Sequence, residues 1–135
     1  MTKNILKIKQ LEPKNLKEIR DFLENFLQQN NIREDNIFIL KLALDEVCQN
    51  VIRYSYKQEP LPLEITLNIE KDNLVISIRD FAKQKTTLED FKPRDLDDIK
   101  AGGLGTTFIK NAVDEMYFSK NIEKGNCLNL IKKIT

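Results

Sequence analysis

The chain has 135 residues, with 22 lysines and arginines against 21 aspartates and glutamates, and a formal net charge of +1. This length suits one domain with its own hydrophobic core, which we expect to span residues 1–135. Because the charges balance, nothing favours nucleic acid or an anionic membrane as a partner. No apolar run reaches the ~20 residues of a membrane span, and the N-terminus lacks the apolar stretch of a signal peptide. We therefore expect a cytoplasmic protein.

The residue types present limit the possible chemistry. There is no histidine, which excludes histidine metal sites, Ser-His-Asp and Cys-His catalysis, and a phosphohistidine formed on this chain. Cys48 and Cys127 lie far apart without metal-ligand spacing, so we interpret them as reduced thiols. A general base must be a carboxylate, lysine, tyrosine or cysteine.

The first half of the chain predicts a strand followed by two helices. Alternation predicts the strand over residues 4–10. Pro13 opens a helix whose apolar residues recur as far as Leu27. A second helix is predicted over residues 34–56, with one apolar stripe facing the core, formed by Ile37, Leu40, Leu44, Val47 and Val51.

The second half predicts four strands and a further helix. Alternating residues 63–69 and 74–78 predict a hairpin with its turn at 71–73. The remaining elements are a helix over residues 107–116 and strands over 116–122 and 127–134, joined by a turn at Gly125-Asn126. The predicted fold is α+β, a two-layer sandwich with the helices on one face of a mixed, mostly antiparallel sheet.

The segment between the hairpin and the third helix has no regular periodicity. Residues 82–101 are charged and contain Pro93. Structureless connections of ~20 residues are uncommon and are either functional lids or disordered. We expect a lid.

Glu46 and Asn50 lie four residues apart on the second helix and project from the same side. The same direction holds Ile39, Leu42 and Ala43, so a carboxylate and an amide interrupt an apolar face. Either water and ligand reach that face, or the two polar groups are satisfied internally. An ordinary polar helix edge is the alternative. Their neighbours Asp45 and Gln49 are expected to be solvated.

Asp80 ends the second strand of the predicted hairpin. A carboxylate at a strand end often caps the following turn. The alternative is a buried acceptor for a ligand N–H.

Three of the four glycines, Gly102, Gly103 and Gly105, precede the third predicted helix. Glycine permits positive φ and close approach of the backbone, and a helix N-terminus binds phosphate. The alternative is a tight turn without a ligand.

Taken in order, these elements resemble the motifs of the histidine-kinase-like ATPases. Residues 42–52 (LALDEVCQNVI) resemble their N box, Asp80 the start of their first glycine box, and residues 101–110 (AGGLGTTFIK) their second. The chain is most similar to the anti-sigma factor serine kinases of the RsbW and SpoIIAB type. The resemblance implies the Bergerat-type fold of that superfamily, ATP and Mg²⁺ as cofactors, and a homodimer. It also implies a STAS-type anti-sigma antagonist and a sigma factor as partners.

The resemblance also implies a role for each matching residue. Glu46 would be the catalytic base that activates the attacking hydroxyl. Asn50 would coordinate Mg²⁺, and Asp80 would accept a hydrogen bond from the adenine amino group. The other nucleotide-binding residues would be Ala82, Gly102, Gly103, Leu104, Gly105, Thr106 and Thr107.

The first glycine box departs from the family pattern, Asp-x-Gly-x-Gly, since here it reads Asp80-Phe81-Ala82-Lys83-Gln84. If those positions need positive φ, Ala82 and Gln84 are penalised. Three interpretations stay open: a serine/threonine kinase that sequesters a sigma factor, a protein-interaction module with impaired nucleotide binding, and a stand-alone sensor-kinase ATPase fragment.

Overall fold

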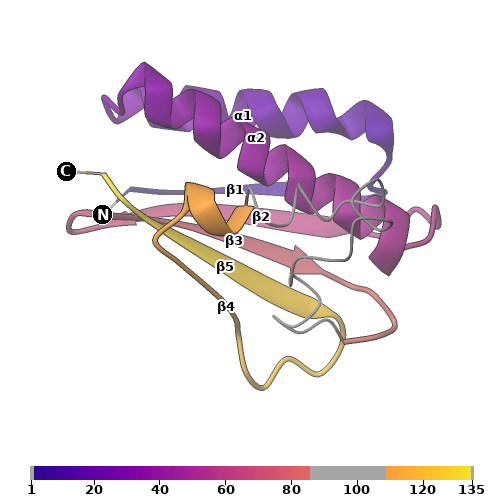
Figure 1. The fold of residues 1–135 in the computed structure, drawn as a ribbon. Helices are drawn as coiled ribbons and strands as arrows, with labels where there is room; N and C mark the ends of the chain where they lie inside the picture. The colour runs from indigo at the N-terminus through magenta and orange to yellow at the C-terminus, as the bar shows by residue number, and fades with distance from the viewer. Residues whose placement is uncertain (1, 86–108, 135) are drawn as a thin grey trace, which may run out of the picture.

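The computed structural model describes residues 2–85 and 109–134. Two helices, α1 (Leu16–Gln29) and α2 (Glu34–Asn50), lie side by side on one face of a five-stranded sheet (Figure 1). The strands are β1 (Thr2–Ile8), β2 (Leu63–Glu70), β3 (Asn73–Asp80), β4 (Glu115–Phe118) and β5 (Asn126–Lys133). None of the described helices is both long and apolar enough to cross a membrane.

The sheet has the order β1-β2-β3-β5-β4, and all four pairings between its described strands are antiparallel. The predicted fold class is therefore confirmed, although the sheet is antiparallel rather than mixed. Strand β3 is central: it forms a hairpin with β2 and pairs on its other side with β5, which forms a hairpin with β4. Its register sets Asp80 opposite both Leu63 of β2 and Asn126 of β5.

The core lies between the two layers. Alternate residues of β2 and β3 face the helices, so Leu63, Ile65, Ile76 and Ile78 are at most 1% exposed. The predicted stripe of the second helix is buried against them, as expected. Both cysteines are free: Cys48 is buried in this core, and burial raises the pKa of its thiol far above the usual range.

The N-terminal elements differ from prediction at their ends. Strand β1 covers Thr2–Ile8 rather than residues 4–10, because its partner β2 begins at Leu63, opposite Ile8. The second helix changes its hydrogen bonding after Asn50 and continues as a π-helix, η2 (Val51–Ser55). Such π-helical turns occur frequently at functional sites.

The third helix and the strand after it are shorter than predicted. Residues 109–112 are helical, and β4 begins at Glu115, so the prediction that the helix extends to residue 116 is wrong. Asp114 ends it by joining β5: its N–H donates to the Ile131 carbonyl, and its carboxylate accepts the N–H of Lys133 at 2.6 Å. Strand β4 ends at Phe118, and Asn121 in the following loop has a φ of 63°, which is incompatible with a strand.

Candidate functional site

Glu46 and Asn50 lie near the C-terminal end of α2, and both are half-buried. Asn50 is the last residue of α2, where the α-helical pattern gives way to the π-helix. The face that they share is exposed at Ile39 (37%) and Leu42 (44%) and buried at Ala43 (0%).

The side-chain oxygen of Asn50 is a polar atom without a partner. Oδ1 is inaccessible to solvent and accepts no hydrogen bond from any residue that the structure describes. Leaving such an oxygen unsatisfied costs about 1–3 kcal/mol. An amide oxygen is a suitable ligand for Mg²⁺, which is bound in proteins through few protein oxygens together with water and substrate phosphates. The oxygen ligand that Asn50 offers therefore fits Mg²⁺, the metal that the sequence resemblance implied.

Two adjacent carboxylates of α2 have different surroundings. Asp45 accepts hydrogen bonds from Arg20 of α1 at 2.7 Å and from Gln49 at 2.6 Å, and Gln49 in turn accepts from Arg53 at 2.9 Å. The expectation that Asp45 is solvated is wrong, since its side chain is only 17% exposed. Glu46, in contrast, has no hydrogen bond or ion pair with any described residue. Of these two carboxylates, Glu46 is the one without a partner among the described residues.

Asp80 is buried at the end of β3, with 5% of its surface exposed. Its Oδ1 accepts the N–H of Ala82 at 3.0 Å, and the N–H and Nδ2 of Asn126 at 3.1 Å each. Burial raises the pKa of this carboxyl, and the hydrogen bonds counteract part of that rise. Oδ2 has a single contact to a described residue, Nδ2 of Asn126 at 3.4 Å. Asp80 thus caps its turn through one oxygen and keeps most of the capacity of the other.

The turn after Asp80 forms without glycine. Neither Ala82 nor Gln84 is among the described residues with positive φ, so the departure from the Asp-x-Gly-x-Gly pattern causes no backbone strain of that kind. Ala82 is 1% exposed and small. The hydroxyl of Tyr56 accepts the N–H of Phe81 at 2.9 Å and donates to the Pro62 carbonyl. Burial raises the pKa of Tyr56 to about 12, so this hydroxyl keeps its proton.

Sequence reasoning missed Asn126 and Tyr56 as parts of the site. Asn126 was interpreted only as a turn residue. The signal was its place two residues before Leu128 and four before Leu130, which puts a polar side chain on the buried face of β5. For Tyr56 the sequence holds no such signal, because its two partners come from other parts of the chain.

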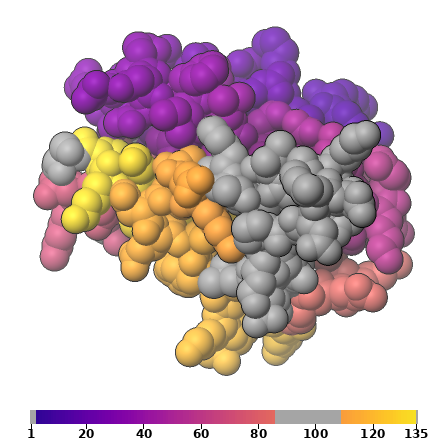
Figure 2. Space-filling view, in the orientation of Figure 1, coloured from indigo at the N-terminus to yellow at the C-terminus, as the bar shows by residue number. Residues whose placement is uncertain are grey.

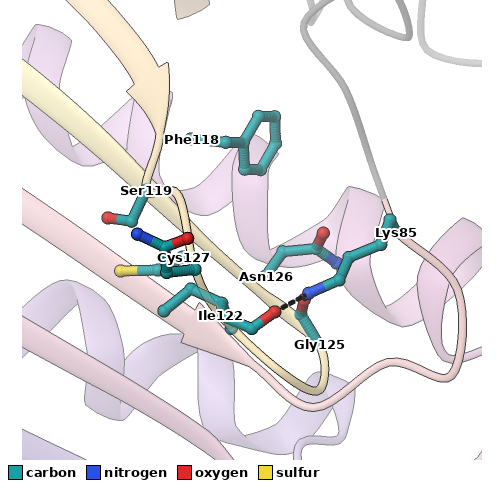
Figure 3. A pocket seen from close by; sticks show the side chains of 8 residues that line it. Lys85, Phe118, Ser119, Ile122, Gly125, Asn126 and Cys127 are labelled. Atoms are coloured by element: carbon teal, nitrogen blue, oxygen red, sulfur yellow. Dashed lines mark hydrogen bonds between the residues drawn. The ribbon is translucent and has the colours of Figure 1, made fainter.

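Asn126 also lines a small cavity between the β4–β5 loop and the start of the segment that follows Asp80 (Figure 3). Lys85 reaches across it and donates to the carbonyls of Ile122 and, at 2.7 Å, Gly125. The cavity has a volume of about 170 Å³, below the ~300–1,000 Å³ of ordinary ligand pockets. It does not form a nucleotide site by itself.

The rest of the predicted site, Gly102, Gly103, Leu104, Gly105, Thr106 and Thr107, lies outside the described residues, as does the predicted lid from residue 86 onward.

A family model described as the histidine kinase-like ATPase domain matches residues 10–132 of the chain. The chain belongs to this family.

Two curated relatives show which branch of this ATPase family the chain resembles. The anti-sigma F factor of Anoxybacillus flavithermus is 25% identical over 114 residues, covering 82% of this chain and 78% of the relative. The serine-protein kinase RsbW of Bacillus velezensis is 24% identical over 118 residues, covering 82% of this chain and 74% of the relative. The chain is thus distantly related to proteins of both descriptions.

Solved structures confirm the histidine-kinase-like ATPase fold. A structure of the RsbU and RsbW domains of a Mycobacterium tuberculosis protein matches 97% of this chain with a TM-score of 0.68 at 15% identity. This chain spans 32% of that longer one. A SiaB-SiaC complex from Pseudomonas aeruginosa matches 93% of this chain and 88% of the other, with a TM-score of 0.69 at 16% identity.

Proposed function

We propose that this ATPase-family protein is an ATP-dependent protein serine/threonine kinase that also acts as an anti-sigma factor. In this proposal it phosphorylates a STAS-type anti-sigma antagonist and sequesters a sigma factor. The observation that carries the kinase part is the pair formed by Asn50, whose buried oxygen lacks a partner in the described structure, and Glu46, one helical turn earlier. The distant relationship to proteins named anti-sigma F factor and RsbW supports the assignment of partners.

In the proposed reaction, the carboxylate of Glu46 accepts the proton of a serine or threonine hydroxyl. The hydroxyl oxygen forms a bond to the γ-phosphorus of ATP, and the bond from that phosphorus to the β–γ bridging oxygen breaks, leaving ADP. Asn50 would hold Mg²⁺ through Oδ1, and the bound ion would neutralise charge on the phosphates. Asp80 would accept a hydrogen bond from the adenine amino group through Oδ2, the oxygen with fewer hydrogen bonds. Residues 82–101 would form the lid, and 102–107 the phosphate-binding turn.

The runner-up is a protein-interaction module with impaired nucleotide binding. It is favoured by the absence of both glycines from Asp80-Phe81-Ala82-Lys83-Gln84. The negative φ of Ala82 and Gln84 counts against it, since the turn does not require glycine there.

Nucleotide binding separates the two functions. Mg²⁺-ATP at 100 times its Kd should stabilise a kinase by about 2.7 kcal/mol, which a melting curve detects. If millimolar Mg²⁺-ATP leaves the melting temperature unchanged, the kinase proposal fails. Transfer of label from [γ-³²P]ATP to a purified STAS-domain protein, in an acid-stable form, would identify a phosphoester. Acid-labile label would instead indicate a sensor-type kinase.

A further inference from the structure

The outer surface of α2 carries an apolar patch that the described structure leaves uncovered. Phe38 is 63%, Leu42 44% and Ile39 37% exposed. Six large apolar side chains are exposed among the described residues, and these three lie within five consecutive positions of one helix. In the space-filling view, the outer side of the helical layer is open to solvent (Figure 2). Concentrated exposure of this kind marks an interaction surface more often than isolated exposed residues do.

The patch continues directly into the candidate catalytic position. At 100° per residue, Ile39 and Leu42 lie on the same side of α2 as Glu46. Leu42 is one turn, or ~6 Å, and Ile39 two turns, or ~10 Å, from Glu46 along the axis. A protein bound over Phe38, Ile39 and Leu42 therefore reaches the carboxylate that has no partner among the described residues.

The position of Glu46 disfavours a second copy of this chain as the occupant. Asp35, at the N-terminal end of the patch, is paired with Arg33 at 2.9 Å, whereas Glu46, at its C-terminal end, has no ion pair with a described residue. Two copies packed antiparallel through this surface would bury Glu46 and block its access to a hydroxyl. A partner that brings a basic group near Glu46 has the complementary charge.

We propose that Phe38, Ile39 and Leu42 form the docking surface for the protein that accepts the phosphoryl group. The complementary surface of that protein is apolar, has a basic residue at the rim near Glu46, and lies beside the accepting serine or threonine. This inference rests on the proposed kinase function and adds the surface that selects the substrate. The patch raises the local occupancy of the acceptor without taking part in the chemistry.

The test uses Phe38→Gln and Leu42→Gln, which keep a good helix former at each exposed position. The matched control is Ile5→Thr on β1, since Ile5 is 51% exposed and lies outside the patch. The probe is a purified STAS-domain protein from the same genome, and the measurements are phosphotransfer kinetics and calorimetric binding in the presence of Mg²⁺-ADP. We expect each patch variant to raise the KM for the acceptor, and its Kd, about tenfold or more. The kcat at saturating acceptor and the affinity for nucleotide should not change.

The outcomes distinguish the docking surface from the kinase function. An unchanged KM in both patch variants, or an equal rise in the Ile5→Thr control, would overturn the docking proposal and leave the kinase intact. If the wild type binds the STAS-domain protein without transferring phosphate, the kinase proposal fails. In that case a higher Kd of the patch variants for the STAS-domain protein supports the docking surface, and an unchanged Kd overturns it. If the wild type binds no STAS-domain protein of its genome, docking as proposed is wrong. If either patch variant dissociates a homodimer in sedimentation, the occupant is a second copy, which also overturns it.

Discussion

Asp80 Oδ1 lies 3.1 Å from both the backbone nitrogen and Nδ2 of Asn126, a residue 46 positions later in the chain. The two residues sit opposite each other at one end of β3 and β5. A buried carboxylate is thereby held by donors from a different hairpin. The arrangement fixes Oδ1, while Oδ2 makes only the 3.4 Å contact to a described residue.

The raised pKa of Asp80 has a consequence for stability. Because its pKa is higher in the folded than in the unfolded chain, the folded state binds more protons between the two values, and the free energy of unfolding falls as pH rises through that range. Below about pH 4 the Asp80 carboxyl is protonated in both the folded and the unfolded chain, so it no longer makes the free energy of unfolding depend on pH. We expect Asp80→Asn to remove this pH-dependent loss. Urea unfolding of both proteins over a pH series measures it, and a difference that does not change with pH would contradict the assignment.

Glu46→Gln should separate chemistry from binding. Glutamine keeps the shape of the side chain but cannot accept the hydroxyl proton, so phosphotransfer should fall by about 10²–10⁴-fold while the Kd for Mg²⁺-ADP stays close to that of the wild type. The matched control is Glu34→Gln, an exposed carboxylate in the first turn of the same helix. Parallel loss of nucleotide binding in Glu46→Gln would show a structural role.

Asn50→Ala should act on metal and nucleotide binding instead. It removes the one buried oxygen of the candidate site that lacks a described partner, so calorimetry should show weaker binding of Mg²⁺-ADP. The apo protein should lose little stability, because no described hydrogen bond to Oδ1 is broken. A large drop in apo stability, with the affinity for Mg²⁺-ADP preserved, would argue against Asn50 as a metal ligand.

Tyr56→Phe should weaken the support of the Asp80 turn. The substitution removes a hydroxyl that bonds both the Phe81 N–H and the Pro62 carbonyl, and leaving those groups unpaired costs about 1–3 kcal/mol. Chemical denaturation measures this loss, with Tyr117→Phe, a 46% exposed tyrosine on β4, as the control. Equal effects of both substitutions would show that the hydroxyl of Tyr56 contributes nothing specific.

Arg20→Ala tests the link between the two helices. Its ion pair with Asp45 joins α1 to α2 and is partly shielded from solvent, so we expect a loss of about 1 kcal/mol. The exposed pair of Lys17 and Asp21 on α1 is the comparison, and Lys17→Ala should change stability by less than about 0.5 kcal/mol. If both variants lose the same amount, the link between the helices contributes no more than a surface pair.

The sequence predicted the order of the elements well because helical and strand periodicities are local. Leu63 to Ile69 and Leu74 to Ile78 alternate whatever their partners are. Element ends were less predictable, since they depend on distant contacts. The third helix ends before Asp114 because β5 supplies hydrogen-bond partners for the backbone and the side chain of that residue. The same limit applies to the site. Glu46 and Asn50 could be paired by spacing on one helix, whereas Asp45 could not be assigned its contact with Arg20 from another.

The central position of β3 also bears on how the protein is made. Three of the four hydrogen bonds that the Asp80 carboxylate accepts from described residues come from Asn126 in the last strand. Because a domain generally folds as a unit, a nascent chain that ends before β5 holds Glu46 and Asn50 but lacks the donors that complete the Asp80 turn.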